Sequence, residues 1–325
     1  MKEGRGLTIA GRVGSRMLGR GFGTALALLL TAFIFLCAFA SAQADDSDYW
    51  SKKANYWYQR GLEHAGAGSY EEALEAYNKA IEMDSENVGA WDGRALALKS
   101  LSLSEKDPIK FSESLKSYDR SIELYGNIID ANPQDINALY YKGLALTGKA
   151  LTMKAGEKLN ISSNKEDRVK CFEDAIAAYD RAIEIDPEYV TAWKNKGNVL
   201  YSLGKYNESL EALNKALEIV PDYGLAWYSK GLTLYEMGRY EESVAAYDMA
   251  LKTFPENAGI WYNKGKALSD EGNYDAAIAC YDKAIKLEPS FAEAWHGKGV
   301  AFEKLGLDTS ANAAFDKARI MGYGE

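Results

Sequence analysis

The strongest constraint on this chain is a pattern that recurs every 34 residues between Val190 and Phe291. One tryptophan, one glycine, one tyrosine, one alanine and one proline return at this spacing. They are Trp193, Trp227 and Trp261; Gly197, Gly231 and Gly265; Tyr206, Tyr240 and Tyr274; Ala216, Ala250 and Ala284; and Pro221, Pro255 and Pro289. A fixed period of this length indicates stacked copies of one supersecondary unit. The chain is therefore divided by counting repeats and not by typical domain length.

The spacing inside one unit predicts a pair of helices. Trp227, Gly231 and Leu234 fall on one face of a first helix. We expect Gly238 to end this helix, because a residue without Cβ accepts the left-handed conformation that closes a helix. A second stripe of apolar and small residues follows at Tyr240, Ser243, Tyr247 and Ala250. Pro255 is expected to stop the second helix, and Trp227 is expected to be buried between the helices.

The pattern W-x-x-K-G-x-x-L, G-x-Y-x-x-[SA], Y-x-x-A and a closing proline resembles the tetratricopeptide repeat. The chain departs from it by placing lysine before the first glycine of the unit, at Lys196, Lys230, Lys264 and Lys298. The resemblance implies an all-α fold, a right-handed α-solenoid superhelix of antiparallel helix pairs. It also implies that the first helices line a concave face.

Seven repeats are predicted over residues 54–325. Their ranges are 54–87, 88–135, 136–189, 190–223, 224–257, 258–291 and 292–325. The second and third are 48 and 54 residues long and so exceed the period. In the second, we expect seven extra residues after Ile122 to add about two turns to the second helix, and the segment 99–110 to separate the helices. In the third, residues 150–159 are expected to prolong the first helix and residues 160–167 to form a polar loop. A local protrusion from the array is the expected result.

The N-terminal 44 residues have the pattern of a secretory signal. Residues 1–20 contain five basic residues and one acidic residue, and residues 21–44 contain no charge. Ala42, Gln43 and Ala44 resemble a cleavage site, so cleavage after Ala44 is expected. An uncleaved membrane anchor is the alternative, since residues 21–44 are long enough to cross a bilayer. Both alternatives place the repeats outside the cytoplasm, behind a short polar linker at 45–53.

Charge and composition exclude several function classes. The net charge is −9, and because residues 1–44 carry +4, the remainder carries −13. An acidic array lacks the basic surface that nucleic-acid binding requires. The two histidines, His64 and His296, lie in distant repeats, so we predict no metal site, no cofactor and no catalytic residues. Cys171 and Cys280 are expected to be free, buried thiols.

The resemblance implies a partner-binding concave face, whose residues come from the first helices. The predicted set is Tyr58, Tyr140, Lys194, Asn198, Tyr201, Tyr228, Tyr235, Tyr262, Lys266 and His296. The tyrosines would form an aromatic ladder, a residue type favoured in interfaces; alternatively, some of them only pack between neighbouring repeats. Members of the family that clamp a peptide carboxylate carry further residues, which Ser229, Gly259 and Asn263 do not supply.

The sequence thus predicts a non-catalytic extracytoplasmic scaffold that binds a protein or peptide segment and assembles or tethers a cell-envelope complex. A carbohydrate or cell-wall binding module that uses stacked tyrosines is the alternative. No closing polar helix follows the last repeat, so we expect the array either to end without a cap or to pair with another copy of the chain. Asn160 and Asn207 begin N-glycosylation sequons.

Overall fold

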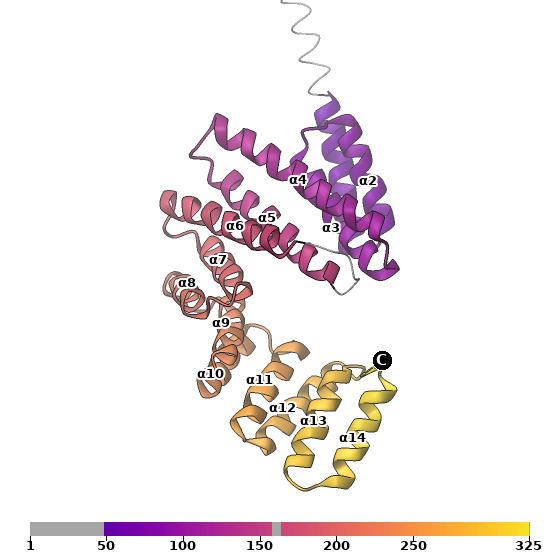
Figure 1. Cartoon of the computed structure of the whole chain (residues 1–325), viewed down its shortest axis with the longest axis vertical. Helices are drawn as coiled ribbons and strands as arrows, with labels where there is room; N and C mark the ends of the chain where they lie inside the picture. The colour runs from indigo at the N-terminus through magenta and orange to yellow at the C-terminus, as the bar shows by residue number, and fades with distance from the viewer. Residues whose placement is uncertain (1–48, 158–163, 325) are drawn as a thin grey trace, which may run out of the picture. The chain divides into compact units, whose positions relative to one another are not determined.

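The computed structural model describes residues 49–157 and 164–324, and the regular elements in these residues are helices, with no strand among them. Residues 49–66 form the first helix. The helices that follow are α2 (Tyr70–Met83), α3 (Val88–Glu105), α4 (Pro108–Ala131), α5 (Ile136–Gly156), α6 (Lys165–Ile185), α7 (Val190–Ser202), α8 (Tyr206–Ile219), α9 (Gly224–Glu236), α10 (Tyr240–Thr253), α11 (Ala258–Glu271), α12 (Tyr274–Leu287), α13 (Ala292–Lys304) and α14 (Asp308–Ile320). Figure 1 labels them from α2 onwards.

The chain divides into two compact units, Met1–Ala90 and Trp91–Glu325. In the first unit, Gly61 of the first helix lies against the ring of Tyr77 in α2, so these two helices pack closely. Tyr77 is 1% exposed and, with Ala73 and Ala80, forms the core of the pair. The first helix already includes Tyr49, within the segment predicted as a linker, so the polar lead-in is shorter than expected.

In the second unit each helix packs against its neighbours along the chain, from α4 to α14 (Figure 1). The first helices of consecutive repeats also contact each other, α5 with α7, α7 with α9, α9 with α11 and α11 with α13. Two layers result, one of first helices and one of second helices. This arrangement confirms the predicted α-solenoid of helix pairs.

A glycine and a large side chain interlock at the crossing of every helix pair except that of the second repeat, where Ala95 takes the place of the glycine. A Cβ atom added to Gly231 in α9 would lie 2.5 Å from Cε1 of Tyr247 in α10, which is 1% exposed. The same close approach joins Gly143 to Tyr179, Gly265 to Tyr281 and Gly299 to Phe315. The small residue that the pattern places on the first helix therefore admits the ring from the second helix.

The turn inside the pair also follows the prediction. Gly238, after α9, has a φ of 72°, a left-handed conformation that L-residues with a Cβ adopt at a cost. Its N–H donates to the Tyr235 carbonyl at 2.9 Å, and the Arg239 N–H donates to the Leu234 carbonyl at 3.0 Å. These bonds satisfy carbonyls that the end of the helix leaves open.

The prediction that Trp227 is buried is wrong, because its side chain is half-buried. The indole Nε1–H donates to the Pro221 carbonyl oxygen at 2.7 Å, and Nζ of Lys230 lies 5.0 Å from the ring centroid. The equivalent indoles donate in the same way, Trp193 to Pro187, Trp261 to Pro255 and Trp295 to Pro289. The tryptophan thus stabilises the turn between repeats through its indole N–H. The same hydrogen bond keeps one edge of the ring at the surface.

The lysine that departs from the family pattern joins two repeats. Nζ of Lys196, Lys264 and Lys298 lies 2.5 Å from a carboxylate oxygen of Asp180, Asp248 and Asp282 respectively, on the second helix of the preceding repeat. Lys230 instead donates to the side-chain oxygen of Asn214 at 2.8 Å. The lysine at this position therefore connects each of these repeats to the preceding one.

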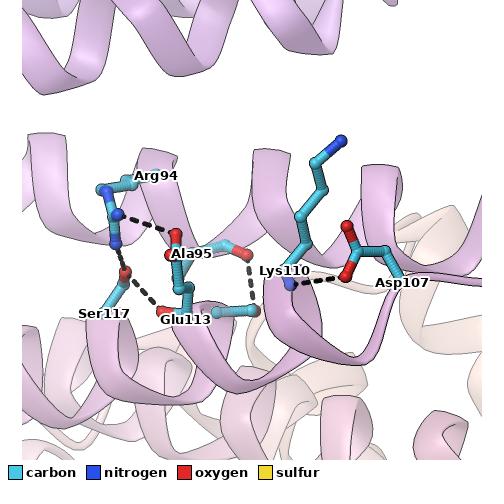
Figure 2. A network of polar contacts seen from close by, with 7 residues as sticks. Arg94, Ala95, Asp107, Lys110, Glu113 and Ser117 are labelled. Carbon is cyan, nitrogen blue, oxygen red and sulfur yellow. Dashed lines mark hydrogen bonds and ion pairs between the residues drawn. The ribbon is translucent and has the colours of Figure 1, made fainter. Parts of the chain in front are cut away.

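In the second repeat the position is occupied by Arg94 of α3, which binds α4 (Figure 2). Its guanidinium donates to Ser117 Oγ at 2.5 Å and to Glu113 Oε2 at 3.1 Å. The hydroxyl of Ser114 donates to the Ala95 carbonyl at 2.7 Å. These bonds fix α3 against α4 within the same pair.

The extra residues of the second repeat are helical to a greater extent than predicted. α3 continues to Glu105 and α4 begins at Pro108, so two residues connect helices that the sequence placed further apart. Asp107 caps α4, since its Oδ1 accepts from the backbone N–H of Ile109 at 2.7 Å and of Lys110 at 3.2 Å. Figure 2 shows the second of these bonds. α4 extends to Ala131, which confirms the prolonged second helix.

In the third repeat, α5 extends to Gly156, so the predicted prolongation holds over residues 150–156. The predicted loop at 160–167 is wrong at its end, because α6 begins at Lys165. Asn164 caps this helix by accepting from the Glu166 N–H at 3.0 Å, and acidic residues in a first helical turn favour the dipole.

Two predictions fall outside the described residues: the signal or anchor segment 1–44 and the sequon at Asn160. Among the residues that are described, no helix is long and apolar enough to cross a membrane. Cys171 and Cys280 are buried free thiols, as predicted.

Candidate protein-binding face of the first helices

The predicted partner-binding residues of the second unit lie on the layer of first helices, α5, α7, α9, α11 and α13. We call the side of this layer that carries Tyr140, Lys194, Tyr228, Tyr262 and His296 the first-helix face. Each of these five residues directly follows the first-helix tryptophan of its repeat, or Leu139 in the third repeat. Contacts between consecutive first helices make the face continuous from α5 to α13.

The aromatic residues of this row pack against rings of the second helices and are still partly exposed. Ring centroids lie 6.1 Å apart for Tyr140 and Tyr179, 6.1 Å for Tyr228 and Tyr247, 6.0 Å for Tyr262 and Tyr281, and 5.4 Å for His296 and Phe315. Tyr58 packs on Tyr77 in the same way in the first unit, at 6.2 Å. All five first-helix side chains remain partly exposed. Packing and surface exposure therefore coexist in the same rings.

Two of the hydroxyls are bonded to the next first helix. Tyr140 accepts from Asn195 Nδ2 at 3.0 Å, and Tyr228 accepts from Asn263 Nδ2 at 3.1 Å. Burial raises the pKa of Tyr228, while the Asn263 hydrogen bond opposes this shift. The sequence did not identify these asparagines as part of the face. Their shared position, two residues after the repeat tryptophan, is the signal that would have found them.

A second row of tyrosines lies in the last turn of the first helices. Tyr235 donates to Asp270 Oδ2 in the next repeat, and Tyr201 donates to Glu236 Oε1 over a long 3.5 Å. Burial, together with the nearby Glu236 carboxylate, raises the pKa of Tyr201 to about 12. Nζ of Lys266 lies 4.3 Å from the Tyr235 ring centroid. The row is therefore also held in register by contacts between repeats.

Lys194 and His296 interrupt the aromatic row. Lys194 takes the position of a tyrosine in the fourth repeat, where Leu213 replaces the second-helix tyrosine. Burial lowers the pKa of Lys194 and of His296. The imidazole of His296 is stacked on Tyr323, with ring centroids 4.1 Å apart and an interplanar angle of 19°. Asn198 lies one turn after Lys194 and is half-buried.

Asp92 holds the same position in the second repeat and is the most unusual residue of the row. Its Oδ2 accepts from the Tyr125 hydroxyl at 2.8 Å, and Tyr125 is stacked on Tyr141 with ring centroids 6.3 Å apart. Asp92 Oδ1 and the hydroxyl of Tyr118 are buried without a hydrogen-bond partner in the described part of the chain. Burial raises the pKa of Asp92 to about 6. The extended end of α4 supplies Tyr125, and so covers this carboxylate.

We expect the variant Asp92→Asn to be more stable than the wild type at pH 8. The folded-state pKa of about 6 lies above the value of about 3.9 for a free aspartate, so folding opposes the charged form. The resulting penalty is complete above pH 6 and disappears as the pH falls towards 4. The gain should be about 1–3 kcal/mol at pH 8 and close to zero at pH 4. Urea unfolding at both pH values measures it.

Asp248→Asn is the matched control for this experiment, because Asp248 is 51% exposed and paired with Lys264. This variant should gain no stability at pH 8. A gain for Asp92→Asn that is the same at pH 4 and pH 8 would contradict the assigned burial of a charged carboxylate.

The sequon at Asn207 is divided between surface and core. Asn207 is exposed, but Ser209 is 0% exposed and its hydroxyl donates to the Gly197 carbonyl at 2.8 Å. In the folded chain the Ser209 hydroxyl, which an oligosaccharide transferase would have to recognise, is therefore buried and hydrogen-bonded between two helices. Residues 49–157 and 164–324 contain no group of three His, Cys, Asp or Glu residues that could hold a metal ion.

Comparisons with known proteins agree with the repeat architecture. The family model described as TPR repeat matches residues 172–204, 197–238, 231–272 and 265–306, and that described as Tetratricopeptide repeat matches residues 54–87. Together these matches span slightly more than half of the 325 residues. The uncharacterised protein MJ0572 of Methanocaldococcus jannaschii is 46% identical over 55 residues, which are 17% of this chain and 64% of that protein. The match thus spans less than two thirds of this relative.

Solved structures that match part of this chain include MamA and YrrB. A MamA crystal structure is 26% identical and covers 50% of this chain and 96% of its own, with a TM-score of 0.46. MamA of Desulfovibrio magneticus RS-1 is 20% identical, with coverages of 47% and 87% and a TM-score of 0.46. YrrB, described as a TPR protein with an unusual peptide-binding site, is 21% identical, with coverages of 62% and 93% and a TM-score of 0.47.

The family models match residues 54–87, in the first helix and α2, and residues 172–306, from within α6 to the end of α13. The marker glycines, tyrosines and prolines of those repeats form the helix crossings and turns described above. This chain belongs to the tetratricopeptide-repeat family.

Proposed function

We propose that this protein is a non-catalytic scaffold outside the cytoplasm whose first-helix face binds a segment of another protein during assembly or tethering of a cell-envelope complex. Tetratricopeptide-repeat proteins are in general scaffolds for protein interaction. The residues of this chain indicate where a partner would bind and which kind of surface it would meet.

The observation that carries the proposal is the surface of the fifth and sixth repeats. Tyr228, Tyr235 and Tyr262 are partly exposed there, Leu225 is 45% exposed, and Lys266 is exposed. Large amphipathic rings beside an apolar side chain and a charge resemble the composition of interface cores, in which tyrosine is enriched. Hydrogen bonds between repeats hold the rings in place before binding, which reduces the entropy lost on association.

The packing role of the tyrosines limits how they can be used as probes. Because one side of the Tyr228 ring lies on Tyr247, replacing it by alanine removes core contact as well as surface. Leu225 is 45% exposed, and Lys266 is an exposed residue whose Nζ lies over the Tyr235 ring and not in the core. Substitutions at these two positions therefore report on binding more directly.

The location outside the cytoplasm is proposed from the sequence of residues 1–44. A basic segment, an uncharged apolar segment and the Ala-Gln-Ala sequence support export, with cleavage after Ala44 or retention as an anchor. Self-association is a further possibility on the α13–α14 pair, which carries exposed large apolar side chains. These are Leu305, Leu307, Ile320, Met321 and Tyr323.

A carbohydrate or cell-wall binding module is the second candidate. The partly exposed rings of Tyr228, Tyr235 and Tyr262 are planar platforms that also carry a hydrogen-bonding tip. Sugars can use both features. The same experiment separates this candidate from the first.

The test is a cross-linking pull-down from native membranes and medium with the tagged full chain. We expect a protein partner whose recovery falls about tenfold or more with Leu225→Asp, since burial of a leucine is worth about 1.5–3 kcal/mol and 1.4 kcal/mol is tenfold in affinity. Tyr228→Ala and Lys266→Glu should lower recovery as well. Leu287→Asp is the matched control, because Leu287 is 39% exposed at the end of the second helix α12.

Equal recovery with all variants would refute the first-helix face as the binding surface. Retention on wall polymer that is lost with Tyr228→Ala, without a protein partner, would favour the carbohydrate candidate. Mass determination of the N-terminus of the endogenous chain completes the test. A start at Asp45 would indicate release, and an intact Met1 would indicate anchoring.

A further inference from the structure

An apolar pocket opens on the second-helix side of the sixth repeat, away from the first-helix face. Its volume is about 380 Å³, and its lining residues are Val244, Trp261, Lys264, Leu268, Ala276, Ala279, Cys280 and Lys283. They come from α10, α11 and α12. Leu268 and Cys280 form its floor and are 7% and 6% exposed, while Ala279 and Lys283 are exposed at the surface. Small-molecule sites typically have about 300–1,000 Å³.

The wall of the sixth-repeat pocket lacks an acidic side chain that three sister repeats carry. Ala276 is the third residue of the second helix α12. The same position holds Glu72 in α2, Glu208 in α8 and Glu242 in α10. Replacing glutamate by alanine removes both the volume and the charge from the wall of the pocket.

The charge at this pocket is positive. No acidic residue lines it. Lys264 forms a salt bridge with Asp248 at 2.5 Å, and Asp248 is not one of the lining residues. Lys283 at the rim has no ionic partner within residues 49–157 and 164–324 and thus offers a solvated ammonium group beside an apolar floor.

A pocket of about 500 Å³ at the fourth repeat has the opposite character. Its lining includes Glu208, Glu211 and Glu218, together with Trp193, Lys196, Ala212, Asn214 and Lys215. Lys215 is bonded to Glu218 and Lys196 to Asp180, so Glu208 and Glu211 leave an excess of negative charge. The two pockets lie at equivalent positions of their repeats, and the sixth-repeat pocket differs in having no acidic residue in its lining.

We propose that the sixth-repeat pocket is a second binding site, which takes a large apolar side chain of a partner protein with a carboxylate next to it. The apolar side chain fills the space between Val244, Leu268 and Ala276. The carboxylate pairs with Lys283 at the rim. The site is separate from the first-helix face, so it lets one repeat array hold two segments at once.

The experiment uses N-acetyl-phenylalaninate as the probe, with the full chain labelled at its alanine and valine methyl groups. We expect saturable shifts of the Ala279 and Val244 resonances. N-acetyl-phenylalaninamide, which lacks the carboxylate, should bind about fivefold more weakly, because an exposed ion pair is worth up to about 1 kcal/mol. The cation 2-phenylethylammonium should bind more weakly still.

Ala276→Glu is the decisive variant, because it restores the residue that three sister repeats carry and so keeps the helix intact. It should abolish the shifts caused by N-acetyl-phenylalaninate. Lys283→Gln, at an exposed position that leaves the fold unchanged, should weaken the probe about fivefold while leaving the amide unaffected. Leu225→Asp, on the other face, should have no effect.

Absence of saturable shifts, equal binding of the anionic and cationic probes, or full binding to Ala276→Glu would each overturn the proposal. These outcomes are independent of the pull-down that tests the first-helix face. Loss of partner recovery with Leu225→Asp would stand even if the pocket bound none of the probes.

Discussion

Replacement of Tyr247 by alanine is expected to lower the free energy of unfolding by about 3–5 kcal/mol. The side chain is 1% exposed at the crossing of α9 and α10, lies against Gly231, and packs with Tyr228 at 6.1 Å between ring centroids. Its removal leaves a cavity beside Gly231. This residue has no side chain that could fill the space. Urea unfolding followed by circular dichroism measures the change.

Two variants show whether the loss comes from the ring. Tyr247→Phe keeps the ring and should cost less than about 1.5 kcal/mol. Trp227→Ala, at the half-buried tryptophan, should cost about 1–3 kcal/mol, because part of that ring already faces water and the Pro221 carbonyl can bond to solvent instead. A larger effect for Trp227 than for Tyr247 would contradict the observed division of the repeat between core and surface.

The repeat register was predictable from sequence because its markers are backbone-determining residues. Gly238 marks a left-handed turn, Pro255 marks a helix end, and Gly231 marks a close helix crossing. Each of these has one main structural use, so their recurrence gives the helix boundaries directly. The burial of Trp227 was predicted wrongly, since an amphipathic ring can be anchored by its N–H at the surface as readily as it can be buried.

The elongated repeats were predicted in part. The extra turns of α4 follow from an apolar stripe that continues past Ile122. The merging of residues 99–105 into α3 does not follow, because serine and leucine alternate there without a helical stripe. Asp107 and Asn164 are capping residues whose role could be proposed from sequence, since both precede a helical segment and belong to the preferred N-cap types.

The candidate sites differ in how far the sequence reveals them. The first-helix row was found from the repeat position, but whether its hydroxyls face solvent or the next repeat depends on helix orientation. The structural roles of Asn263 and Tyr125 follow only from their hydrogen bonds, which join Asn263 to Tyr228 and Tyr125 to Asp92. The sixth-repeat pocket left a sequence signal, the alanine at position 276 where sister repeats have glutamate. Its meaning required the neighbouring Val244 and Lys283 from α10 and α12.

Introducing a branched side chain at Gly231 is expected to be as damaging as removing its partner. A Cβ at this position would lie 2.5 Å from Cε1 and 2.7 Å from Cδ1 of Tyr247. Tyr247 cannot retreat, because it is fully buried among Ala250, Leu251 and Ile260. Gly231→Val should therefore separate α9 from α10 and cost about 3 kcal/mol. The gain of well under 1 kcal/mol in helix propensity that valine has over glycine cannot offset this cost.

Gly126→Val is the matched control that isolates the crossing from the properties of valine. Gly126 lies inside α4, and the only atom within 4 Å of its added Cβ in the described residues is Nζ of Lys142 at 3.8 Å, the end of a flexible side chain. Its stability should therefore stay within about 0.5 kcal/mol of the wild type. If thermal and urea unfolding showed equal losses for both variants, the cause would be the backbone preference of valine. A loss confined to Gly231→Val would assign the cost to the contact with Tyr247, and thus to the interlock of glycine and ring that recurs along the array.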